Sequence, residues 1–196
     1  MNAEKLFAKY MRELEKQCED QNRITKFERG LRWSIWNFYF FTKMAQGKYV
    51  VWCNKMTAFG DEFGDKLVSL EFLWDLGWFQ REDVFGKTGV ECCALALEQE
   101  LSSVWMERWF DFDKILFADV THFRVFIGRA SNKAFETMPK EFATYYEHSK
   151  CRKGKRQLLL MLFNKSSGKL RIGGWILKNG SATLLKDKTF FYAGAI

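Results

Sequence analysis

Residues 90–100 read VECCALALEQE, and this is the most apolar of the segments that have the character of a β-strand. Successive side chains of a strand point to opposite faces, so small and apolar residues fall on both faces here. A strand that is apolar on both faces belongs in the middle of a sheet that is covered on both sides. Residues 90–100 therefore predict an α/β fold with a covered central sheet.

The segments on either side alternate between helical and strand periodicity. Apolar residues at steps of three and four predict a first amphipathic helix around Leu6 and Leu14, and a second helix from Thr25 to Gly47. Further helices are expected over residues 102–117 and from Pro139, which suits a first helical turn, to His148. Strands are expected over residues 49–53, 67–74, 78–85, 123–128, 158–163, 169–177 and 182–185. Tight turns are expected at residues 86–89 and 179–180.

This order contains no internal repeat and no linker, which predicts a single domain with a mixed central β-sheet flanked by helices. Residues 25–130 would form a core with the order α-β-β-β-α-β. Residues 1–24 would be an N-terminal helical extension. Residues 131–196 would add a basic C-terminal helix and strands.

The composition excludes several classes of protein. With 47% apolar and 28% charged residues, the chain is expected to be globular. No apolar run reaches the length of about 18 residues that a membrane span needs, and the charged N-terminus does not resemble a signal peptide. Five cysteines at irregular spacing and two histidines do not form a zinc pattern. We therefore expect a cytoplasmic protein that does not contact a membrane.

The positive charge is concentrated in the last fifty residues. The net charge is +7, while residues 147–196 contain eleven basic and two acidic residues. The excess begins with five closely spaced residues, which are Lys150, Arg152, Lys153, Lys155 and Arg156. A polyanion is the expected partner of such a segment, and nucleic acid is the commonest polyanion. These five residues are therefore predicted to contact nucleic acid.

Two carboxylates lie at the carboxyl end of the apolar strand. Glu98 and Glu100 lie on the same face of this strand, and Asp83 lies on the strand before it. Neighbouring buried carboxylates are costly unless a cation, a proton or basic side chains compensate them. Three converging carboxylates would suit Mg²⁺ or Mn²⁺, which can activate a water next to a phosphate. A symmetric turn at residues 86–89 would instead place Asp83 near Cys92 and Asp75 opposite Glu100, so Asp75 is the alternative to Asp83.

The order α-β-β-β-α-β, with an acid on one strand and a Glu-x-acid on the next, resembles the restriction-endonuclease-like superfamily, PD-(D/E)XK. The resemblance covers residues 25–130. It implies that Asp83 is the first acid and Glu98 the second, and the family's spacing favours Asp83 over Asp75. Glu100 stands where most members have lysine and a minority have Glu. Lys114 on the next helix is the candidate replacement for that lysine.

Two single positions are also compared with the family's pattern. The family's proline before the first acid is absent, because Glu82 precedes Asp83. Glu28 matches an auxiliary acid of some members, although Thr25 and Glu28 also form a capping-box pattern.

The resemblance implies a metal-dependent nuclease that hydrolyses the phosphodiester bonds of DNA with Mg²⁺ or Mn²⁺. In that reading Asp83, Glu98 and Glu100 hold the metal and Lys114 assists the reaction. The alternative is a catalytically inactive protein of this fold that binds nucleic acid or a protein partner as a regulator or inhibitor. A homodimer is compatible with both readings.

Overall fold

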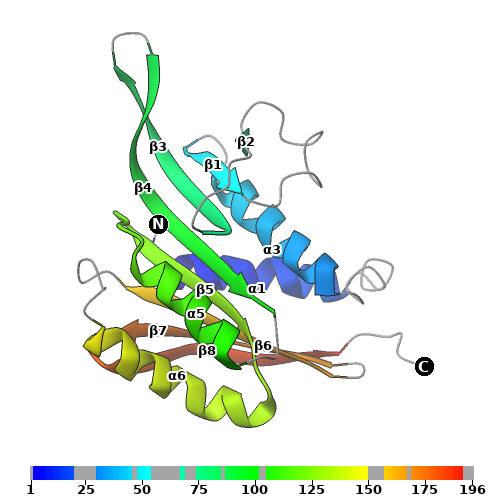
Figure 1. Ribbon diagram of the computed structural model, residues 1–196. Coiled ribbons are helices and arrows are strands. Elements are labelled where there is room, and N and C mark those ends of the chain that lie inside the picture. Colours follow the sequence, from blue (N-terminus) through cyan, green and yellow to red (C-terminus); the bar gives the residue numbers. More distant parts are fainter. Residues whose placement is uncertain are drawn as a thin grey trace.

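The structure is a computed structural model, and it describes residues 2–19, 30–45, 48–53, 67–68, 74–84, 87–101, 105–149, 157–166 and 169–191. The strands in these ranges form one mixed sheet with the order β2-β1-β3-β4-β5-β6-β7-β8 (Figure 1). Their bounds are Val50–Cys53 (β1), Leu67–Val68 (β2), Leu76–Val84 (β3), Lys87–Glu100 (β4), Phe123–Arg129 (β5), Leu158–Ser166 (β6), Lys169–Lys178 (β7) and Ser181–Phe191 (β8).

The sheet is parallel in its middle and antiparallel on either side. β5 runs parallel to both of its neighbours, β4 and β6, and the short β2 runs parallel to β1. All other neighbours are antiparallel. The two central parallel connections contain the helices α5 (Trp105–Leu116) and α6 (Asn132–His148), as parallel neighbours require a crossover.

Helices cover both faces of the sheet. α1 (Ala3–Glu19) and α3 (Gly30–Ala45) share one apolar core with Leu95 and Leu97 of β4. α5 and α6 share a second core with Ala96 on the opposite face of the same strand. β4 is thus apolar on both sides because it is covered on both sides, which confirms the α/β class predicted from residues 90–100.

The N-terminal helix is part of this core. Phe7 of α1 lies so close to β7 that a Cβ on Gly174 would be 2.3 Å from the Phe7 ring, which explains the glycine at this position. At the other end of α1, Glu15 pairs with Lys188 at 2.9 Å and with Lys186 at 3.2 Å, both on β8. Residues 3–19 therefore pack on the sheet and are not a detached extension.

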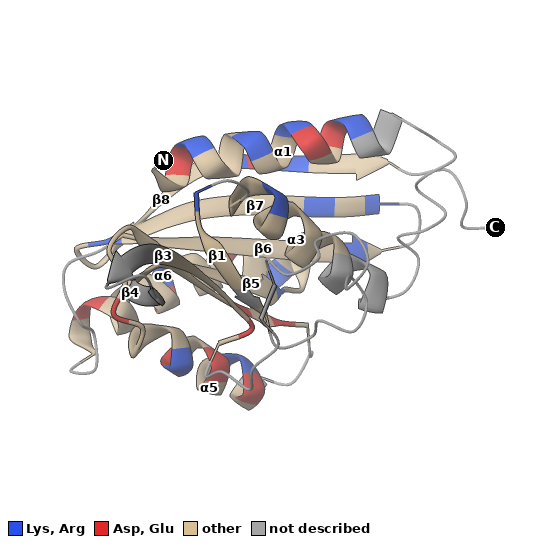
Figure 2. Cartoon of the chain, turned by 90° about the horizontal axis from the view of Figure 1, so that it is seen from above, with Lys and Arg blue, Asp and Glu red and all other residues tan. Residues whose placement is uncertain are grey.

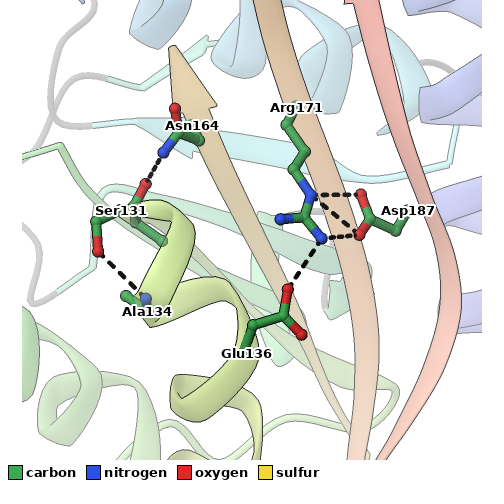
Figure 3. A network of polar contacts seen from close by, with 7 residues as sticks. Ser131, Ala134, Glu136, Asn164, Arg171 and Asp187 are labelled. Carbon is green, nitrogen blue, oxygen red and sulfur yellow. Dashed lines mark hydrogen bonds and ion pairs between the residues drawn. The ribbon is translucent and has the colours of Figure 1, made fainter. Parts of the chain in front are cut away.

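Polar contacts fix α6 at the opposite face. Ser131 caps the helix by accepting a hydrogen bond from the Ala134 amide at 3.2 Å (Figure 3). Arg171 of β7 bridges Glu136 of α6, at 3.2 Å, and Asp187 of β8 (Figure 3). These contacts join the start of the helix to two neighbouring strands.

Several predicted boundaries need correction. α6 begins at Asn132, and Pro139 lies inside it, because the Ser131 cap fixes the start of the helix two turns earlier. The turn predicted at residues 86–89 is wrong, since Val84 already pairs with Lys87. The turn at 179–180 is confirmed, with positive φ at Asn179 (51°) and Gly180 (70°).

Other predicted features fall partly outside the described residues. Only Leu67–Val68 of the strand expected over 67–74 is observed as a strand, and residues 69–73 are not among those described. α3 begins at Gly30 within the described residues. The capping-box pair Thr25 and Glu28 lies outside them.

Candidate active site

The hairpin register brings Asp75 and Glu98 together at the carboxyl end of β4. Leu76 pairs with Leu97, so Asp75, the residue before β3, lies beside Glu98. The Asp75 amide donates a hydrogen bond to Glu98 Oε2 at 3.1 Å, and the Gln99 amide donates one to Asp75 Oδ2 at 3.0 Å. Both acids are buried. Each carboxylate is thus held by the backbone of the other's strand.

Asp83 does not reach this site. It pairs with Thr88, ten residues before Glu98 on β4. At about 3.3 Å per residue the two positions are roughly 30 Å apart. Figure 1 shows this end of the β3–β4 hairpin projecting away from α5. The prediction that Asp83 is the first acid is therefore corrected, because the turn is shorter than expected and the resulting register selects Asp75.

Lys114 of α5 lies next to Glu98. Its Nζ is 3.2 Å from Glu98 Oε1, and it also pairs with Asp111 one turn earlier on the helix. Trp74, next to Asp75, donates from Nε1 to the Lys114 carbonyl oxygen at 3.1 Å, which ties the end of α5 to the start of β3. Asp111 was not predicted from the sequence, although its i, i+3 spacing to Lys114 is a usable signal.

Glu100 is two residues further along β4 and is half-buried. Strand alternation puts it on the same side as Glu98. Burial lowers the pKa of the Arg108 guanidinium on α5, and the nearby Glu100 carboxylate opposes that shift. Glu98 and Glu100 thus both lie on the side of the sheet that α5 covers.

Burial and charge act against ionisation of Glu98. Its burial, followed by the negative charge of Asp75, raises the pKa of Glu98 to about 8, although Lys114 acts in the opposite direction. A carboxylate in this position is stabilised by a proton or by an added positive charge. Lys114 already supplies one such positive charge next to Glu98.

Few described side chains at this end of β4 could act as metal ligands. Among the described residues no group of three or more His, Cys, Asp or Glu side chains is arranged to hold a metal ion. Mg²⁺, however, is usually bound through one or two carboxylates, with waters and substrate phosphates as its other ligands. Asp75 and Glu98 fit the role of these one or two carboxylate ligands. Glu100 is the next acid along the same face of β4.

A neutral hydrogen-bonded chain fixes the other side of the same strand end. Gln99 points away from Glu98, and its Oε1 accepts a hydrogen bond from Asn37 Nδ2 of α3. Asn37 Oδ1 in turn accepts one from the Tyr10 hydroxyl of α1 at 2.7 Å. All three side chains are buried. These hydrogen bonds were not predicted from the sequence. An Asn in the apolar face of a helix, such as Asn37, is a signal that indicates a buried polar network.

The basic segment predicted to bind nucleic acid lies outside the described residues, which include none of Lys150, Arg152, Lys153, Lys155 and Arg156. Within the described part, Figure 2 shows basic residues repeated along α1. These are Lys5, Lys9, Arg12 and Lys16, at steps of three and four. These four residues were not among those predicted to contact nucleic acid.

Searches of family models, curated proteins and solved structures find no match to this chain. None of the described helices has the length and apolar character needed to cross a membrane. The function is therefore inferred from the geometry of the described residues.

Proposed function

We propose that this protein is a divalent-metal-dependent nuclease that hydrolyses phosphodiester bonds of DNA. The observation that carries the proposal is the meeting of Asp75, Glu98 and Lys114 at one strand end. Two buried carboxylates lie side by side there, with Lys114 Nζ 3.2 Å from Glu98 Oε1.

The arrangement of the elements also supports a restriction-endonuclease-like core. α3, β1, β3, β4, α5 and β5 follow each other in the order α-β-β-β-α-β, with the short β2 between β1 and β3. β1, β3 and β4 are successively antiparallel, and β5 is parallel to β4. Asp75 then takes the place of the first acid, preceded by Trp74 where the family has proline. Glu98 takes the place of the second acid.

Each residue has a distinct role in this proposal. Asp75 and Glu98 would hold Mg²⁺ or Mn²⁺, and Glu100 would support it from the same side of the strand. The ion would activate a water for attack on the phosphorus and neutralise charge on the phosphate. With a cation bound at the acids, the Lys114 ammonium would be available to stabilise the negative charge that develops on the phosphate.

Cleavage assays with supercoiled plasmid and with single-stranded DNA test the proposal. Wild type is expected to cut in Mg²⁺ or Mn²⁺ and to be inactive with chelator. Glu98→Gln should reduce the rate by at least about 100-fold, since it removes a metal ligand without changing the size of the side chain. Glu141→Gln is the matched control, because Glu141 is exposed on α6. Cleavage that persists in Glu98→Gln would contradict the proposal.

The second candidate is an inactive protein of the same fold that binds nucleic acid. It is favoured by the saturation of Glu98, whose two oxygens already accept from Lys114 and from the Asp75 amide. In that case wild type would not cut in either metal, while its binding to DNA would still weaken steeply with salt.

A further inference from the structure

A basic cavity with an aromatic wall lies on the face of the sheet away from Lys114. It has a volume of about 440 Å³ and is formed by α1, the end of α3, β3 and the start of β5. Trp78 in its wall belongs to the apolar core under α1 and α3. Glu98 is on the opposite side, facing α5. The cavity is therefore separate from the candidate active site.

Three lysines line this cavity without a compensating acid. Lys5 and Lys9 are one turn apart on α1, and Lys48 follows the end of α3. None of the three forms an ion pair with an acid among the described residues, and the cavity's lining includes no Asp or Glu. Like charges gathered around one hollow attract an anion. Lysines commonly bind phosphate groups in proteins, as point charges.

The inner wall carries rings and polar groups. The Tyr49 ring is stacked on Trp78, with centroids 5.4 Å apart and planes 19° apart. The Tyr49 hydroxyl is 3.3 Å from His122 Nε2, and Thr121 Oγ1 is 2.9 Å from His122 Nδ1, so the imidazole is fixed in place. Trp78 Nε1 is buried and has no hydrogen-bond partner among the described residues. A flat heterocycle suits such a wall because it stacks on aromatic faces and offers hydrogen-bonding edges.

The positive surface continues beyond the cavity. A second hollow, of about 550 Å³, shares Lys9 and Met44 with the first one and is lined by Arg12, Lys16 and Lys43, with Glu13 as its acid. A ligand with more than one phosphate could therefore extend along α1. The volume of the first cavity lies within the range of about 300–1,000 Å³ that is typical of small-ligand sites.

We propose that this cavity binds a nucleotide, with its phosphates held by Lys5, Lys9 and Lys48 and its base packed against Tyr49, which covers the buried Trp78, and His122. The nucleotide is either free or the 5′-phosphorylated end of a nucleic-acid strand, because both present the same groups. The proposal does not depend on the nuclease activity, since it uses none of the acids at the end of β4.

Titration calorimetry of the full chain with ADP, GDP, CDP and UDP tests this site, with inorganic phosphate as the probe for the anion alone. Fluorescence anisotropy with oligonucleotides that carry a 5′-phosphate or a 5′-hydroxyl tests the strand end. We expect at least one nucleotide, free or at the 5′ end, to bind at least tenfold more tightly than inorganic phosphate. Preference for the 5′-phosphorylated strand over all free nucleotides would identify the strand end as the source.

The variant Lys5→Gln/Lys9→Gln/Lys48→Gln should lower that affinity at least tenfold. The control variant Lys133→Gln/Lys140→Gln/Lys178→Gln removes the same charge from exposed positions elsewhere. Glu98→Gln should bind as wild type does, so failure of cleavage and failure of this site are separate results. Equal losses in both triple variants, or nucleotide binding no tighter than that of inorganic phosphate, would overturn the proposal.

Discussion

Glu98 and Gln99 are neighbours on one strand, yet the two sides of the strand end have opposite character. Glu98 faces α5 and meets Asp75, Lys114 and Asp111, all of them ionisable. Gln99 faces α3 and joins a neutral chain through Asn37 to Tyr10. The neutral side satisfies its own polar groups, whereas the charged side keeps a carboxylate that burial disfavours. Buried groups with perturbed ionisation are concentrated at functional sites, so the difference points to the charged side as the place of chemistry.

The largest effect that separates the two sides should be a dependence of stability on pH. The pKa of Glu98 is raised from 4.5 to about 8 by burial and by Asp75. The folded state therefore keeps this proton after the unfolded state has lost it, and its stabilising effect is lost as pH rises from about 4.5 to about 8. We expect a loss on the order of 5 kcal/mol in the free energy of unfolding.

Chemical denaturation in chelator, at a series of pH values, measures this loss. Glu98→Gln should show a much smaller decrease than wild type over the same range, because its amide does not titrate. Identical pH profiles for the two proteins would mean that Glu98 ionises at its ordinary pKa.

A smaller effect is expected on the neutral side. Asn37→Leu removes the hydrogen bonds to both Gln99 and Tyr10, and should lower the free energy of unfolding by about 2 kcal/mol. Asn37 and Gln99 do not titrate, and burial raises the pKa of Tyr10 further above neutrality, so the loss should be the same at pH 5 and pH 8. Denaturant titrations at both pH values measure it. A loss confined to one pH would show that the two sides are electrostatically coupled.

The sequence predicted the central strand and its two glutamates, but not the register in which β3 pairs with β4. The apolar stretch ending in Glu98 indicated a central strand, and its Glu-x-Glu pattern located the carboxylates. The partner acid depends on that register. Glycines at residues 86 and 89 suggested a later turn than the one that pairs Val84 with Lys87. A turn at residues 86–89 would also have left Asp83 six residues from Glu98, near Cys92, so both turns favour Asp75. Only the spacing typical of the resembled family had favoured Asp83.

The basic cavity shows a second limit of sequence reasoning. Lys5, Lys48 and His122 are far apart in the chain, and only the packing of α1 and α3 on the sheet brings them to one place. The basic run after residue 149 is a strong signal because five basic residues fall within seven positions. Lysines spaced by a helical turn give a weaker signal, since the same spacing is typical of any solvated helix face.

The central claim is that Asp75 and Glu98, and not Asp83, form the metal site, and the most direct test compares two isosteric variants. Plasmid cleavage in Mg²⁺ and in Mn²⁺ should be measured side by side for wild type, Asp75→Asn and Asp83→Asn. Asp75→Asn is predicted to lose at least about 100-fold in rate. Asp83→Asn is predicted to cut within about twofold of wild type, because its position is roughly 30 Å from Glu98. Loss of cleavage in Asp83→Asn with full activity in Asp75→Asn would contradict the account.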